Sequence, residues 1–241
     1  MGSCATDECI RLLSLGHFSH TELVRSFVQT DGDQLPTVYE VRIIGRRVTL
    51  FSLTAPSEAE IRRFISKQKD SGFSYPEVGA SVTAAPAGYN VDHNRIQLGK
   101  GEDTWRRATE AIRAWRMFSL PWVSLHWPSA PILVGTDVAV SVHHLGFYSL
   151  NACRIVYVVD GDNIVKRFGF AYGTLAEHAE SGEERFTVEW NREDDSVWYD
   201  ILAFSRPRQM LARLGYPLSR LLQKRFAGGS KAAMFQAVRD P

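Results

Sequence analysis

The chain lacks the features typical of secreted and membrane-spanning proteins. Its 241 residues include only three cysteines, Cys4, Cys9 and Cys153, which are too few and too scattered for a disulfide framework. No apolar run approaches the roughly 18–20 residues that a membrane-spanning helix needs. The N-terminus carries Asp7 and Glu8 where a signal peptide would have a basic start. These absences favour a soluble protein of the reducing cytoplasm.

The sequence also lacks an excess of charge of one sign and clusters of metal-ligating residues. The net charge is +1, so no basic field indicates a nucleic-acid partner. His143 and His144 are neighbours on a predicted strand, where their side chains point to opposite faces and cannot share a metal. Gly99 and Gly101 precede a helix, but Thr104 stands where a phosphate loop needs its third glycine. We therefore expect a turn there, no metal, no cofactor and no catalytic residues.

Alternating aromatic residues mark the part of the chain from 166 to 205. Side chains of a strand point alternately to two faces, so aromatics at every second position line one face. Such runs predict strands at about 166–175, 183–190 and 196–205. Further strands are predicted at 91–98, 122–127, 136–144 and 152–159. In the last of the aromatic strands both parities are apolar, which predicts that it is covered on both sides.

Helical spacing appears in three segments. Ser57 and Glu60 form a capping box before a helix at about 57–69. A second helix, at about 103–117, has its apolar residues three and four apart. A long C-terminal helix is predicted from Pro207 to Phe226, with a kink at 215–217, a second break at 228–229 and a short final helix at 230–238.

This order of elements predicts an α+β fold. Short connections favour antiparallel neighbours, and a curved antiparallel sheet of about seven strands needs an element to cover its concave face. We expect the sheet to grip the long C-terminal helix, which is the helix-grip (START/Bet v 1-like) architecture. Residues 56–241 would form this domain. Residues 1–55 would be an accessory N-terminal α/β extension, with short helices at 9–15 and 21–28 and a hairpin at 35–53.

Several short motifs occur in order along residues 57–240. They are F-S-Y-P-E-V-G at 73–79, G-Y-N-V-D-H at 88–93, L-G-x-G at 98–101, Y-G-T-L at 172–175, G-E-E-R-F at 182–186, V-W-Y-D-I at 197–201, F-S-R-P at 204–207, L-G-Y-P at 214–217 and Q-K-R-F at 223–226. Together they resemble an uncharacterised family of bacterial and plant proteins, a domain of unknown function. Its plant members include a chloroplast outer-envelope protein described as a pore. The resemblance implies no catalytic residues.

Polar residues inside apolar strands supply candidate ligand contacts. Burying a lone charge is costly, so Asp200, Glu189 and Arg154 either line a cavity as ion pairs or face water. His93 and Arg95 form part of a polar cluster near the start of the first main-domain strand. The candidate ligand-binding residues are Tyr172, Trp198, Asp200, Arg154, Glu189, His93 and Arg95.

The leading hypothesis is a protein that binds an apolar or amphipathic small molecule between the sheet and the C-terminal helix. Ligand pockets are mostly apolar with a few polar groups, which suits this aromatic composition. The competing interpretation is that the aromatics simply pack the core. Two alternatives are a membrane-associated envelope or pore protein, and an enzyme that uses His93 or Asp200 on a hydrophobic substrate. Membrane contact through the basic edge of the C-terminal helix is not favoured, and the oligomeric state is left open.

Overall fold

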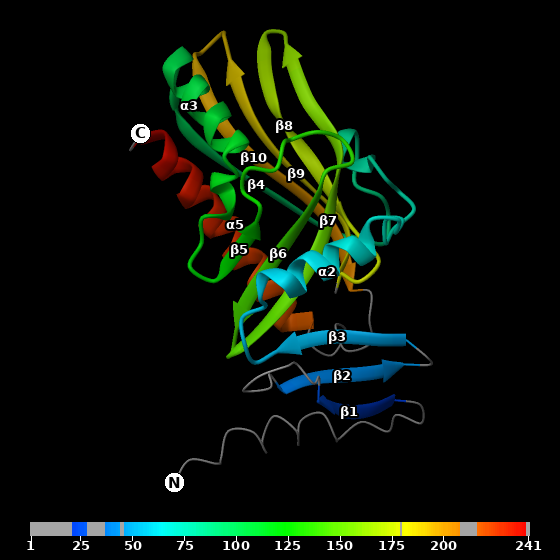
Figure 1. Cartoon of the computed structure of the whole chain (residues 1–241). Coiled ribbons are helices and arrows are strands. Elements are labelled where there is room, and N and C mark those ends of the chain that lie inside the picture. Colours follow the sequence, from blue (N-terminus) through cyan, green and yellow to red (C-terminus); the bar gives the residue numbers. More distant parts are fainter. Residues whose placement is uncertain (1–20, 28–36, 44–45, 179, 208–215, 240–241) are drawn as a thin grey trace. The chain divides into compact units, whose positions relative to one another are not determined.

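The computed structural model of the chain (Figure 1) describes residues 21–27, 37–43, 46–178, 180–207 and 216–239. Contacts divide the chain into two compact units, Met1–Ser52 and Leu53–Pro241. The described part of the first unit contains strands β1 (Thr21–Phe27), β2 (Thr37–Ile43) and β3 (Arg46–Ser52). Both β1 and β3 pair antiparallel with β2.

The hairpin predicted at 35–53 is therefore confirmed as β2 and β3. The helix predicted at 21–28 is wrong, because β1 occupies this segment and pairs with β2 along its whole length. The backbone N–H and C=O groups of this segment pair with those of the neighbouring strand, and this pairing overrides a weak local helical preference. The helix predicted at 9–15 lies outside the described residues.

A seven-stranded antiparallel sheet forms the frame of the second unit. Its order is β5-β6-β7-β8-β9-β10-β4. The strands are β4 (Asn90–Lys100), β5 (Val123–His126), β6 (Asp137–His144), β7 (Phe147–Asp162), β8 (Val165–Thr174), β9 (Glu180–Asn191) and β10 (Ser196–Pro207). All seven strands predicted for this domain are confirmed.

One strand is longer than its sequence pattern indicated. β7 begins at Phe147 rather than near 152, because a two-residue turn joins it to β6. Leu145 and Gly146 both adopt positive φ, at 49° and 79°. Such a turn usually has Asn or Gly at its first position. Because Leu145 stands at this position, the sequence did not indicate a turn.

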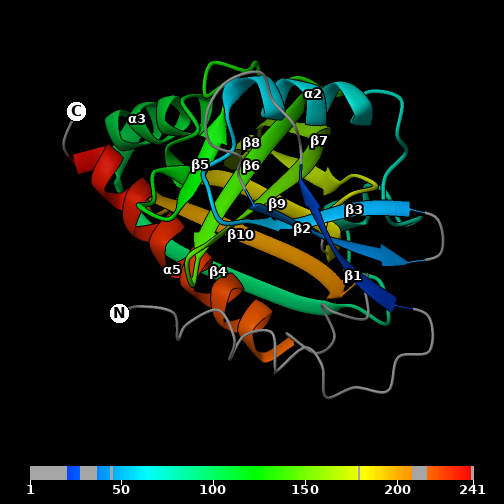
Figure 2. The same cartoon turned by 60° about the horizontal axis from the view of Figure 1, so that its bottom comes forward.

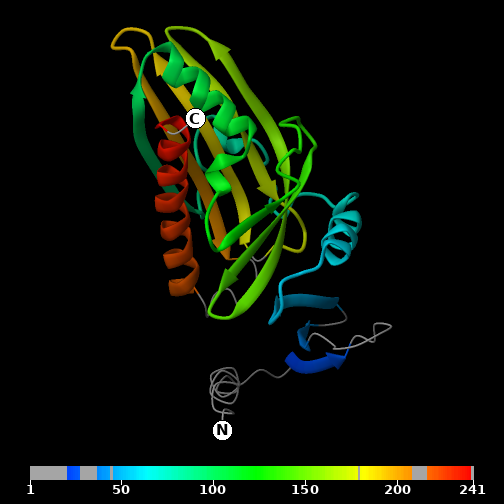
Figure 3. The same cartoon turned by 60° about the vertical axis from the view of Figure 1, so that its left-hand side comes forward.

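Helices cover one face of the sheet, which we call the inner face. α3 (Gly101–Arg113) lies across β9, β4, β10 and β8, and the short η2 (Arg116–Phe118) follows it (Figure 3). Trp105, Ile112, Trp115 and Phe118 from this segment are buried against the sheet, which confirms the predicted apolar stripe. α5 (Tyr216–Arg239) runs beside β4 and contacts α3 and η2 (Figure 2).

The C-terminal helix differs from its prediction at both ends. Pro207 is the last residue of β10 and not the first of a helix, and residues 208–215 lie outside the described part. α5 runs without interruption through 228–229, so the predicted break there is wrong. A Cβ on Gly229 would lie 2.7 Å from Cδ2 of Leu120. The glycine therefore lets the helix approach Leu120 closely. This packing offsets the entropic cost of a glycine in the interior of a helix.

The buried side of α5 is also displaced from the predicted leucine stripe. Ala227, Ser230, Met234 and Val238 are buried, whereas Leu221 is 62% exposed. The Tyr199 and Ser230 hydroxyls share a hydrogen bond of 2.8 Å, which joins the helix to β10. The helix thus grips the sheet through its second half.

The opposite, outer face is covered by α2 (Glu58–Gln68) and by the segment 73–82, which ends in η1 (Ala80–Val82). The capping box of Ser57 and Glu60 that starts α2 is confirmed. The 73–82 segment lies over β9 and β10. It explains why β10 is apolar on both parities, because that strand is covered on both sides.

Candidate functional site

The middle of the inner face is filled by aromatic side chains. Phe170 and Phe186 are fully buried, and their ring centroids are 5.5 Å apart. Phe118 contacts Phe186 and Tyr172 at 5.7 and 6.1 Å, and Trp115 contacts Phe170 at 4.7 Å. These separations are those of packed aromatic pairs. This part of the face is core, as the competing interpretation of the aromatics predicted.

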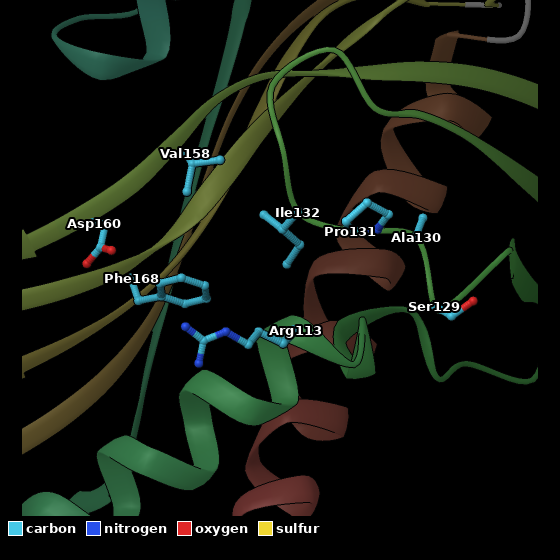
Figure 4. A pocket seen from close by; sticks show the side chains of 8 residues that line it. All are labelled: Arg113, Ser129, Ala130, Pro131, Ile132, Val158, Asp160 and Phe168. Carbon is cyan, nitrogen blue, oxygen red and sulfur yellow. The ribbon is translucent and has the colours of Figure 1, made fainter.

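A pocket opens on the inner face beyond this aromatic core (Figure 4). Its volume is about 390 Å³. The sheet contributes Val158 and Asp160 from β7 and Phe168 from β8, and the end of α3 contributes Arg113. The wall opposite the sheet is the loop segment 129–132, which is held to the helices where the indole nitrogen of Trp115 donates a hydrogen bond of 3.0 Å to the Ala130 carbonyl.

Charge and apolar surface meet in this pocket. Phe168 is 8% exposed, and Ile132 and Val158 are half-buried, so together they provide an apolar floor. The guanidinium of Arg113 lies over the Phe168 ring, 4.4 Å from its centroid, which is a cation–π contact. Figure 4 shows the carboxylate of Asp160 beside the same ring. The pocket therefore offers an apolar surface with one positive and one negative group.

A second polar group of the inner face lies towards α5. The Tyr172 hydroxyl donates a hydrogen bond of 2.8 Å to Glu184, which is half-buried. Burial raises the pKa of Glu184 to about 7, and the nearby charges of Glu180 and Asp92 act in the same direction, against the Tyr172 hydrogen bond. Burial also raises the pKa of Glu180. Glu184 can therefore gain or lose a proton near neutral pH.

The side chains of α5 tie this group to the helix. The Arg220 guanidinium donates to both carboxylate oxygens of Asp92 on β4, one of them at 2.7 Å. The Gln223 amide donates to Glu180 at 2.5 Å and to the Ser205 hydroxyl at 2.9 Å. Three strands and the first half of the helix are thus joined by polar contacts, where the second half uses packing.

Of the seven candidate ligand-binding residues, only Tyr172 lies on the inner face. Five of the others lie on the outer face, as their parity along the strands requires: Trp198, Asp200, Glu189, His93 and Arg95. These five therefore lie on the face opposite the C-terminal helix, and their binding of a ligand stays a prediction. In β10 the inner residues are Val197, Tyr199 and Ile201. Both parities of this strand are apolar, so its pattern could not show which one faces the helix.

The structure brings these five residues together on the outer face. His93 Nε2 lies 2.6 Å from an oxygen of Asp200, whose other oxygen accepts from Arg185 at 3.2 Å. Glu189 accepts from Arg95 at 2.6 Å and from Arg167 at 2.8 Å. Arg95 also lies over the Trp198 ring, 4.7 Å from its centroid. The ion pairs expected from charges in apolar strands are present, but they lie on the outer face of the sheet.

Arg154 lies apart from this group, on β7. It forms a two-point ion pair with Asp137, at 2.6 and 3.0 Å, and donates to the carbonyls of Gln68, Lys69 and Ser71 at the end of α2. Cations are favourable at the C-terminus of a helix, where carbonyls lack partners. Arg154 therefore fastens α2 to the outer face of β7.

Glu183 was missed by the sequence analysis. It is 3% exposed and accepts hydrogen bonds from the Tyr75 hydroxyl at 2.7 Å, the Gly79 amide at 2.8 Å, and the Ser81 amide at 3.1 Å and hydroxyl. It thus holds the F-S-Y-P-E-V-G segment against the sheet. Its neighbour Glu184 points inward, so the E-E pair of the G-E-E-R-F motif serves both faces. The only feature of the sequence that pointed to Glu183 was its place in this motif.

Arg113 and Asp160 were also missed. Arg113 is an exposed residue at the end of α3, and Asp160 is an exposed residue near the end of β7. They come together because α3 lies across the sheet near β7 and β8. A local pattern could not have revealed this.

A curved antiparallel sheet with a C-terminal helix on its inner face defines this protein as a helix-grip protein. Among the residues that the structure describes, no helix is long and apolar enough to cross a membrane. Within the same ranges, no three His, Cys, Asp or Glu side chains gather where they could hold a metal ion.

A family model described as "Domain of unknown function (DUF1990)" matches residues 74–233, and the chain belongs to this family. A UPF0548 protein of Dictyostelium discoideum is 34% identical over 207 residues, covering 78% of this chain and 96% of the relative. A UPF0548 protein of Deinococcus radiodurans is 34% identical over 190 residues, covering 74% and 93%. One of Arabidopsis thaliana is 31% identical over 154 residues, covering 63% and 74%.

Solved structures with a similar course of the chain include two helix-grip proteins. Ara h 8.0201 aligns with a TM-score of 0.41 at 10% identity, covering 64% of this chain and all of its own. Human STARD10 aligns with a TM-score of 0.39 at 10% identity, covering 76% of this chain and 81% of its own.

Proposed function

We propose that this protein binds an apolar or amphipathic small molecule on the inner face of its sheet. The observation that carries the proposal is the pocket lined by Phe168, Val158 and Ile132. Small-molecule sites are concave, mostly apolar, and range over roughly 300–1,000 Å³. The volume of about 390 Å³ lies at the lower end of that range and suits a small ligand.

The walls of the pocket support this proposal. Two of them are strands of the sheet and one is the end of α3, so three sides come from regular elements. A binding site built on such elements loses little conformational entropy when a ligand enters. The remaining wall, 129–132, is a loop whose backbone is anchored by Trp115. We therefore place the ligand beside α3, and not among the packed aromatics at the centre of the face.

The inner polar group lies outside the proposed site. Tyr172 and Glu184 lie on the same face as the pocket. On β8, however, the fully buried Phe170, packed against Trp115, lies between Tyr172 and the pocket residue Phe168. A ligand in the pocket would therefore leave Tyr172 and Glu184 untouched, and a Glu184 substitution should not change its affinity.

Filling the pocket tests the proposal. The neutral fluorescent probe N-phenyl-1-naphthylamine is titrated into the wild-type chain and into an Ile132→Trp variant, whose larger side chain would occupy the pocket. Leu133→Trp is the matched control, because Leu133 is the next residue and is 61% exposed outside the pocket lining. We expect saturable binding by the wild type and the control, and its loss in Ile132→Trp. Equal binding by all three chains would place the ligand elsewhere, and no binding by any would refute the proposal.

A further inference from the structure

The two charged side chains of the pocket differ from most others on the sheet. Neither Arg113 nor Asp160 has an ion pair or a side-chain hydrogen bond with any described residue, whereas Arg95, Arg154 and Arg167 on the outer face all have carboxylate partners. Both are exposed, so neither needs a partner for stability. What distinguishes them is their place, because both border the same apolar floor.

Each of the two groups remains available to a ligand. The guanidinium carbon of Arg113 lies 4.4 Å from the centroid of the Phe168 ring, and no described residue accepts a hydrogen bond from its N–H donors. Asp160 belongs to β7, and its backbone pairs with Phe168, so the carboxylate is carried on a rigid strand. A guanidinium and a carboxylate therefore lie next to one ring. An exposed pair of opposite charges so placed can hold two opposite charges that lie close together on one ligand.

We infer that the pocket takes a small zwitterion with an apolar body, of the kind represented by an aromatic or branched α-amino acid. The anionic group of the ligand pairs with Arg113, its ammonium group pairs with Asp160, and its apolar part lies against Phe168, Val158 and Ile132. This inference rests on the proposed function and specifies the class of ligand for the same pocket. A ligand with one charge would satisfy only one of the two groups.

Four probes with the same phenyl group separate the contributions. They are L-phenylalanine, with both charges; 3-phenylpropanoate, with the negative charge; 2-phenylethylamine, with the positive charge; and 3-phenyl-1-propanol, with neither. Dissociation constants are measured by isothermal titration calorimetry at low salt, since ion pairs at exposed sites weaken as salt rises. We expect phenylalanine to bind about 10-fold more tightly than the alcohol, with the singly charged probes between them.

Single substitutions assign each charge. Arg113→Gln should weaken phenylalanine and phenylpropanoate by about 3- to 10-fold and leave phenylethylamine unchanged. Asp160→Asn should weaken phenylalanine and phenylethylamine and leave phenylpropanoate unchanged. Arg113→Lys keeps the charge and should restore most of the affinity for phenylpropanoate. Arg116→Gln, an exposed arginine outside the pocket lining, is the control and should change nothing.

The outcomes separate this inference from the function on which it rests. Equal affinity for the alcohol and for phenylalanine, or unchanged affinity in both charge variants, would overturn the zwitterion inference and leave the pocket as an apolar site. The same holds if none of the four probes binds while N-phenyl-1-naphthylamine does. If that probe fails as well, the proposed function fails together with the inference.

Discussion

Glu184 gives a prediction about stability that follows from its place on the inner face. Its pKa of about 7 lies about 2.5 units above the ordinary value of 4.5. Each unit corresponds to about 1.4 kcal/mol between the two protonation states, which gives an upper limit of about 3.5 kcal/mol. Because part of the side chain remains open to solvent, water lowers this figure. We expect the ionised carboxylate to cost the folded state about 2 kcal/mol.

The sign of the pH dependence follows from linkage. Between pH 4.5 and 7 the folded chain binds more protons at this position than the unfolded chain, so its contribution to stability falls as the pH rises. The contribution is fully present below pH 4.5 and is lost just above pH 7. Glu184→Gln resembles the protonated form and can still accept the hydrogen bond of Tyr172. The variant should therefore equal the wild type near pH 4.5 and exceed its unfolding free energy by about 2 kcal/mol at pH 8.

Urea unfolding followed by tryptophan fluorescence, at pH 4.5, 6 and 8, measures this difference. Other groups also titrate over this range, so the quantity of interest is the difference between variant and wild type at each pH. Glu177→Gln is the control, because Glu177 is an exposed glutamate near the start of the same strand. A difference that stays constant from pH 4.5 to 8, or a variant less stable than the wild type at pH 8, would refute the assignment of a raised pKa to Glu184.

Three further predictions concern the frame and the outer face. Glu183→Ala should lower the unfolding free energy by about 3–5 kcal/mol in urea titrations, because four donors lose their acceptor, whereas the exposed Glu193→Ala should have little effect. Gly182→Ala should cost more than about 3 kcal/mol, since a Cβ there would lie 1.9 Å from the Phe204 carbonyl oxygen, while Gly161→Ala meets no atom within 4 Å and serves as its control. Trp198→Ala should leave the affinity for N-phenyl-1-naphthylamine unchanged, because Trp198 lies on the outer face; a tenfold loss of affinity without loss of folded protein would place the ligand on that face instead.

The frame of the second unit could be predicted because strands and helices leave periodic signals. Alternation located β8, β9 and β10, and the capping box of Ser57 and Glu60 located the start of α2. The end of β10 and the start of α5 could not be placed in this way. Pro207 suits the first turn of a helix, but it also suits the last position of a strand, where no ladder donor is needed. Gly229 wrongly indicated a break in the helix, because the contact with Leu120 that favours a glycine at this position is distant in the sequence.

The candidate site was less accessible to sequence reasoning than the frame. Parity correctly grouped Trp198 and Asp200 on one face, but it cannot say which face the helices cover. The segment 73–82 covers the outer face, and it is held there by hydrogen bonds to Glu183. A segment held in this way has no periodic pattern in its sequence, so its place could not be predicted. The pocket residues Arg113 and Asp160 lie 47 positions apart in the sequence. They meet only because α3 crosses the sheet.

The adjacent glutamates of β9 also fix the alignment of the strand. Glu183 is satisfied only on the outer face and Glu184 only beside Tyr172, so each requires the other to point the opposite way. A slip of one residue would turn Phe186 and Val188 outward. It would also carry Glu183, Arg185 and Glu189 into the aromatic core, where the burial of unpaired charges is costly. A two-residue acidic pair in the middle of a sheet thus works against misregistered pairing during folding, in addition to its contacts in the folded state.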